Sequence, residues 1–315
     1  MKKRIIFNLF FLCSISVHYL YAQPQYPVPV RTAIFIVDVR DIDGARQSFS
    51  ADVLIRLQWK DPKLVGERKF LPLSAAWHPN VQIVNRSTVQ TTLPEGLEVD
   101  EQGNVTYRQR FIGQFTCSMN LREFPFDKQE FPIRIVAIGF SPQQVQFIPD
   151  PDPTIVGRFS ITDWKVLSSK KEPEIYKVPG SRQLAGFKAT FVAKRYFLFF
   201  LVQIIVPMAL ILGMSWIAFW LDYKQPGPRI SISITSMLTL VAYRYLLANF
   251  IPRLPYLTRM DFFVFSSTSL VFLSLVTVVI ISRFVLKENE ATAIKLDKHS
   301  RWIFPSLFAI VVLIC

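Results

Sequence analysis

The chain has 315 residues, of which 51% are apolar and 28 are phenylalanine, and its formal net charge is +13. This length favours about two domains, and so apolar a composition predicts that part of the chain lies in a membrane. Three cysteines are too few for a disulfide framework. The positive charge falls partly in short loops between apolar segments, which favours cytoplasmic loops over nucleic-acid binding, so no nucleic-acid partner is expected.

Residues 1–22 have the features of a secretory signal peptide. A basic start from Met1 to Arg4 precedes an apolar run from Ile5 to Val17, and Ala22 is small enough for a cleavage site. We therefore expect residues 23–195 to lie outside the cytoplasm, in the periplasm if the cell is a Gram-negative bacterium.

Residues 23–195 predict an antiparallel β-sandwich. Apolar and polar residues alternate over short runs, such as 32–39 and 52–59, and Pro, Gly and Asp separate these runs. The segment has no phosphate-binding glycine loop and no GxSxG motif, and His78 and His299 are too far apart in the chain to share a metal. We expect neither an enzyme nor a cofactor or metal site.

Residues 196–315 predict an all-α transmembrane domain of four helices, at about 197–221, 229–250, 260–284 and 297–315. The first and third contain uncharged runs of 25 and 21 residues, where roughly 20 apolar residues suffice to span. The last uncharged run has 14 residues and spans only if its helix begins near Asp297. These helices predict a multi-pass protein of the cell (inner) membrane, surrounded by lipid. Arg253 and Arg259 fall in the outer loop of this topology and count against it.

One face of the second predicted helix is polar in an ordered way. At steps of four, three, four, three and four, which keep side chains on one side of a helix, it carries Ser231, Thr235, Leu238, Ala242, Tyr245 and Asn249. The order suits a water-filled pore with a hydrophobic constriction at Leu238 that closes by dewetting. The alternative is a buried helix whose hydroxyls bond back to their own carbonyls.

Residues 117–131 resemble the signature loop of the pentameric ligand-gated ion channels, the Cys-loop receptor superfamily. The Phe-Pro-Phe-Asp core of that loop stands here as Phe124-Pro125-Phe126-Asp127. Cys117 occupies the position of the first loop cysteine, but Phe131 occupies the second, as is usual in bacterial members.

The resemblance continues into the predicted membrane domain. Arg195 precedes the first span and Pro207 lies within it, while Pro252-Arg253-Leu254-Pro255-Tyr256 follows the pore helix. The run 238–256 is most similar to the bacterial amine-gated members. The resemblance implies a symmetric homopentamer in which each chain meets four further copies around one pore for permeant ions.

The resemblance also implies a gating interface where the sandwich meets the membrane domain. Its expected members are Asp43, Phe124, Pro125, Phe126, Asp127, Arg195, Pro252, Leu254 and Pro255. We expect an ion pair between Arg195 and Asp127, with Asp43 on a neighbouring turn, to couple the two layers.

The ligand site expected from the family is an aromatic box between subunits. Leu54, Val136 and Ile138 replace the aromatic and acidic residues of the amine-gated members, which leaves Tyr176, Phe187 and Arg108 as candidates. The agonist is therefore either an unknown small molecule or protons acting on shifted carboxylates.

The sign of the permeant ion has two readings. The cytoplasmic mouth at residues 224–229 carries no acid, as in anion-selective members, whereas the most similar bacterial channels conduct cations. We expect cations, with an anion-selective or pH-gated channel, or a non-conducting membrane receptor, as alternatives.

Overall fold

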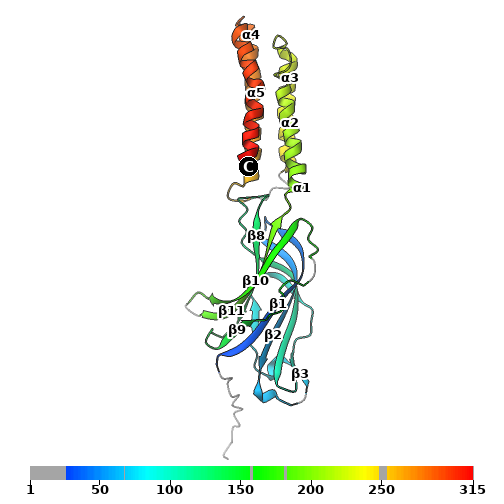
Figure 1. Ribbon diagram of the computed structural model, residues 1–315, viewed down its shortest axis with the longest axis vertical. Helices are drawn as coiled ribbons and strands as arrows, with labels where there is room; N and C mark the ends of the chain where they lie inside the picture. The colour runs from blue at the N-terminus through cyan, green and yellow to red at the C-terminus, as the bar shows by residue number, and fades with distance from the viewer. Residues whose placement is uncertain (1–25, 67, 157–158, 181–182, 248–253, 315) are drawn as a thin grey trace, which may run out of the picture.

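The computed structural model describes residues 26–66, 68–156, 159–180, 183–247 and 254–314. Strands fill one end of its long axis and helices fill the other (Figure 1). The predicted signal peptide, Asn249 and Pro252 lie outside the described residues.

The N-terminal part is the predicted β-sandwich. One sheet contains, in spatial order, β3 (Lys69–Leu71), β6 (Leu97–Val99), β7 (Asn104–Thr116), β2 (Ser48–Lys60), β1 (Val28–Asp43) and β9 (Val145–Pro149), with β5 (Arg86–Thr91) also pairing β7. The other contains β10 (Trp164–Lys177), β11 (Gln183–Arg195), β8 (Lys128–Ala137) and β4 (Val81–Ile83). The named strands pair antiparallel except β1 with β9, which run parallel. The antiparallel sandwich is thus confirmed, with one parallel pair at its edge.

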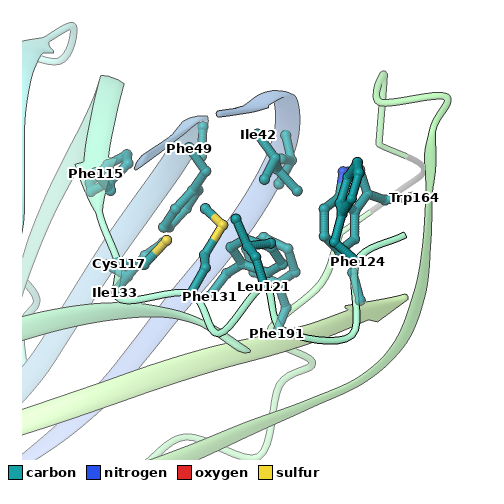
Figure 2. Close-up of a cluster of buried hydrophobic side chains, with 14 of the residues drawn as sticks. Ile42, Phe49, Phe115, Cys117, Leu121, Phe124, Phe131, Ile133, Trp164 and Phe191 are labelled. Atoms are coloured by element: carbon teal, nitrogen blue, oxygen red, sulfur yellow. The ribbon is translucent and has the colours of Figure 1, made fainter. Parts of the chain in front are cut away.

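The sandwich core is built from the inward positions of both sheets. Phe49 of β2 lies 5.5 Å from Phe131 of β8 and 5.6 Å from Phe191 of β11, measured between ring centroids. Figure 2 shows these rings in one cluster with Trp164 and Cys117. Aromatic side chains bury large areas, so this cluster joins the two sheets without a covalent link. Cys117 is a free thiol, and burial raises its pKa to about 12.

The membrane part contains helices close to the predicted ones. The first comprises α1 (Leu198–Phe200), a π-helical turn (Leu201–Ile205) and α2 (Val206–Ile217), and it is followed by α3 (Pro226–Leu247), α4 (Arg259–Leu286) and α5 (Glu290–Ile314). Among the described residues, three helices are long and apolar enough to span a membrane: Leu198–Ile217, Pro226–Leu247 and Arg259–Leu286.

The helix starts follow local capping. Thr258 and Asp261 form a capping box at the start of α4. The fourth helix begins at Glu290, earlier than the Asp297 expected, because the Asn289 side chain accepts a hydrogen bond from the Thr292 N–H at 3.3 Å. Its first turns therefore carry charged residues, and only its second half is uncharged.

Candidate functional site

The predicted pore face of α3 points away from the rest of the subunit. Leu238 is 65% exposed and Tyr245 is 80% exposed, and Ser231, Thr235 and Ala242 are exposed as well. The opposite face is buried against the other helices, with Ser233, Ser236 and Leu240 fully inaccessible. The helix therefore has one face packed inside the subunit and another that only water, lipid or a further subunit can cover.

Hydroxyls of α3 also bond back to the backbone. The Thr235 hydroxyl donates to the Ser231 carbonyl at 2.9 Å, and the Thr239 hydroxyl donates to the Thr235 carbonyl at 2.8 Å. This bonding uses the hydroxyl hydrogen and leaves oxygen lone pairs free to accept. Back-bonding, the mark of the alternative reading, therefore coexists with exposure of the hydroxyls on the outer face.

Arg229 is buried instead of lying open at the helix mouth. Its side chain is inaccessible and pairs with Asp297 of α5, while its Nε donates to the Ala218 carbonyl at 2.7 Å. Asp297 also accepts from Arg301 at 2.8 Å. Arg229, the last of residues 224–229 expected at the cytoplasmic mouth, therefore lies inside α3 and is enclosed by Ala218 and Asp297.

Arg195 and Asp127 form the expected ion pair. Arg195 Nε lies 2.9 Å from Asp127 Oδ1, with the side chains 8% and 1% exposed. The guanidinium stacks 4.1 Å from the Trp164 ring and 5.1 Å from that of Phe124, and Gln129 donates to the other Asp127 oxygen at 2.9 Å. Such a pair is costly to break on one side, because the remaining charge stays buried.

Asp43 does not join this pair. Its carboxylate accepts from the Arg46 N–H at 2.9 Å and lies 3.5 Å from Arg46 Nε, so it organises its own turn. That turn contacts the signature loop through Gln47, whose carbonyl accepts from the Cys117 N–H at 2.9 Å. A side chain at Gly44 would lie 3.0 Å from Leu121, so the turn and the loop are in close contact. Asp43 thus lies on a neighbouring turn, as expected, and its part in coupling the two layers stays a prediction.

The signature loop also contacts the helices directly. The Leu121 N–H donates to the Tyr256 hydroxyl at 3.0 Å, and the Arg259 N–H donates to the Arg122 carbonyl at 2.9 Å. The Arg259 guanidinium lies 2.6 Å from the Glu123 carboxylate. Arg259, which counted against the topology, thus has an acidic partner in the sandwich.

Aromatic contacts complete this interface. The ring of Phe124 lies 4.9 Å from that of Phe200, and the ring of Phe126 lies 5.3 Å from that of Phe197. Leu254 is half-buried and Pro255 is exposed, so the loop before α4 contributes mainly through Tyr256. Sequence reasoning missed Tyr256 and Glu123 as contacts, although both lie within the segments that it singled out.

The three ligand-site candidates occupy different places. Phe187 is wholly buried, 6.3 Å from Phe147 between ring centroids, and belongs to the sandwich core, so its assignment to an aromatic box is wrong. Tyr176 is half-exposed on β10. Arg108 is exposed on β7 of the other sheet and pairs with Glu98 at 2.8 Å. One subunit does not bring Tyr176 and Arg108 onto the same sheet.

Several carboxylates outside the membrane segments are held in their charged form. Partial burial opposes ionisation of Asp38, but hydrogen bonds from the Ser160 N–H and hydroxyl outweigh it and lower the Asp38 pKa. Burial is likewise outweighed at Asp150, where the Asp152 N–H and the Arg56 guanidinium lower the pKa. These two acids remain ionised in mild acid.

Two family models match this chain. One describes the neurotransmitter-gated ion-channel ligand binding domain and matches residues 20–196, and the other describes the neurotransmitter-gated ion-channel transmembrane region and matches residues 204–294. A proton-gated ion channel of Gloeobacter violaceus is 23% identical over 294 residues, covering 90% of this chain and 80% of that relative. These matches and the apolar helices give a membrane protein with an extracellular N-terminal domain, and the family consists of channels, not enzymes. The chain belongs to the neurotransmitter-gated, or pentameric ligand-gated, ion-channel family.

Proposed function

We propose that five copies of this chain surround a pore lined by α3, and that the pore passes small inorganic cations through a hydrophobic gate at Leu238. The carrying observation is the outward face of α3, where exposed Ser231 and Thr235 precede an exposed Leu238. In a closed ring, this face would turn to the axis because it is the one that the subunit leaves uncovered.

The gate is proposed at Leu238 because an alkyl ring repels water more than hydroxyl or methyl rings do. Leu238 is 65% exposed and lies between Thr235 and Ala242 on the same face. A constriction of leucine side chains closes by dewetting and needs no steric block.

We propose cation selectivity because the basic side chains near the pore have acidic partners. Arg229 is sequestered with Asp297, and Lys224 lies 3.2 Å from Glu290, so both basic side chains before Ser231 have acidic partners within the subunit. The exposed hydroxyl oxygen of Thr235 has already donated its hydrogen to the backbone. It therefore offers the pore an acceptor, which favours cations over anions.

The test is the reversal potential of the purified protein in planar bilayers under a NaCl gradient. We expect it to lie near the sodium potential. A shift toward the chloride potential would support the anion-selective alternative, and a protein that binds agonist but never carries current would support the non-conducting receptor.

Protons are the agonist that we favour, because the similar channel of Gloeobacter violaceus is named proton-gated. The shifted carboxylates do not supply the sensor. The pKa values of Asp38 and Asp150 lie below the ordinary range, so the stability they contribute is present above about pH 4 and is lost only as pH falls below it. Activation in milder acid would need other groups.

Whole-cell recording during pH steps, followed by a panel of amines at neutral pH, separates the two agonist classes. Proton gating predicts current on acidification alone. Current evoked only by an amine would favour an aromatic ligand site that includes Tyr176, and Tyr176→Ala would then weaken the response. Arg108→Ala tests whether β7, in the other sheet, also contributes to that site.

A further inference from the structure

The π-helical turn in the first membrane helix exposes a backbone acceptor. The Val206 N–H donates to the Leu201 carbonyl, five residues earlier. Pro207 follows and has no N–H, so it cannot donate to the Gln203 carbonyl four residues before it, as an α-helix would require. A carbonyl without a donor is costly at membrane depth, so it needs a partner from another element.

Tyr243 of α3 supplies that donor. Its hydroxyl donates to the Gln203 carbonyl at 2.7 Å and lies 3.3 Å from the Ile204 carbonyl. Tyr243 is half-buried and follows Leu238 by five positions, which turns it about 140° around the helix from the gate. The hydrogen bond therefore lies behind the pore face and joins the pore helix to the first helix.

We infer that Tyr243 is a positioning residue for the gate. Its bond to the carbonyl freed by Pro207 fixes the rotation of α3 at which Leu238 faces outward from the subunit. A gating movement that rotates or tilts α3 away from the first helix must break this bond. The inference rests on the proposed gate and adds the element that orients it.

The first test removes only the hydroxyl. Tyr243→Phe keeps the ring, and we expect it to shift the midpoint of activation by about two- to tenfold, the range that one hydrogen bond supports. Single-channel conductance should stay at the wild-type value, because Tyr243 does not face the pore. An unchanged midpoint, or an altered conductance at an unchanged midpoint, would overturn the inference.

The second test asks whether Pro207 creates the acceptor. Pro207→Ala restores an N–H that can donate to Gln203, so Tyr243→Phe should have a smaller effect in that background. Equal effects in both backgrounds would contradict the role of Pro207. Tyr245→Phe is the matched control, since it makes the same change on the exposed face and should combine additively with Pro207→Ala.

The wild type, Tyr243→Phe, Pro207→Ala and their double variant can also be compared by thermal unfolding of the purified protein in detergent. This measurement needs no current, so it separates the tie between Tyr243 and Gln203 from the proposed conduction. If the melting temperatures are non-additive but the wild-type protein carries no current, the hydrogen bond between Tyr243 and Gln203 is supported and the proposed channel function is rejected. Additive melting temperatures with normal currents would reject the tie alone.

Discussion

At the scale of single residues, the ion pair of Arg195 and Asp127 differs from the other charge pairs of the sandwich in its burial. It joins the last residue of β11 to the end of the signature loop, with aromatic rings on its flanks. The pair of Arg108 and Glu98 is as short, at 2.8 Å, but lies in solvent, with side chains 46% and 52% exposed. Exposed pairs contribute at most about 1 kcal/mol, whereas breaking one side of a buried pair costs roughly 3–5 kcal/mol.

Arg195→Gln should therefore reach the membrane but lose normal gating, because Asp127 keeps a buried charge without its cation. Recording of agonist responses, together with surface labelling, checks this. Lys170→Gln is the control, since Lys170 pairs with Glu130 at 50% and 63% exposure and belongs to no proposed site, so it should gate as the wild type does. Normal gating by Arg195→Gln at normal surface density would show that the pair is structural only.

The buried positions of Phe187 and Phe131 follow from the spacing of apolar residues along their strands. In β11 the apolar residues Ala185, Phe187, Ala189 and Phe191 follow a spacing of two and are all buried, and Gly186 and Thr190 between them are buried as well. The apolar spacing of two predicts that Phe187 points to the core. Phe131 in β8 also points to the core, where its ring packs against Phe49 and Phe191. At the position of the second loop cysteine, this chain therefore has an aromatic core contact.

At the scale of elements, α3 combines a packed face with an uncovered one. On its packed side, Arg229 contacts Ala218 just after α2 and Asp297 of α5, and Tyr243 contacts the π-helical turn of the first helix. Its uncovered side carries Leu238 and exposed hydroxyls. The helix is thus held near both ends of its buried face. If the gate lies on the uncovered face, as proposed, a rotation of α3 that moves Leu238 must also move the contacts of Arg229 and Tyr243.

Leu238→Ala should open the channel at lower stimulus or leave it leaky, because a ring of methyl groups dewets less readily than a ring of isobutyl groups. The measurement is resting current and activation midpoint at matched expression. Leu273→Ala is a suitable control, since it makes the same change at a side chain that is 50% exposed on α4, a helix that carries none of the proposed pore face. Unchanged resting current and midpoint in Leu238→Ala would place the gate elsewhere.

At the scale of the whole molecule, the sandwich meets the helices through a small set of directional contacts. The signature loop donates to Tyr256 and accepts from the Arg259 backbone, while Glu123 pairs with the Arg259 side chain. These bonds attach the loop to the start of α4, beside the segment that follows the pore helix. We therefore expect a displacement of the sandwich to be transmitted to the outer end of the membrane domain.

Charge reversal tests this contact. Glu123→Lys and Arg259→Glu should each shift the activation midpoint by a factor of up to about five, since exposed pairs contribute about 0.2–1 kcal/mol. The double variant should recover most of the wild-type midpoint. The same exchange at Lys224 and Glu290, a similarly exposed pair at the other end of the helices, controls for general effects of charge. Additive effects of the two single variants would argue against a direct contact in gating.

The sequence by itself determined the elements whose signals are periodic. Alternation of period two predicted the sandwich, long uncharged runs predicted spans, and the spacing from Ser231 to Tyr245 predicted the uncovered face of α3. These features depend on neighbours within a few residues, so they can be read along the chain. The start of α5 also depends on neighbouring residues, because the Asn289 side chain caps it. An asparagine at this position could have indicated the helix start from the sequence.

Only the tertiary structure decided the partners of individual polar groups. The pair of Arg229 and Asp297 joins residues 68 positions apart, and Tyr243 reaches a carbonyl 40 positions earlier. Arg259 has Asp261 nearby in sequence, yet packing selected the distant Glu123 as its partner. Electrostatic and hydrogen-bonding partners depend on distance in space and on burial, and neither is written in the order of residues alone.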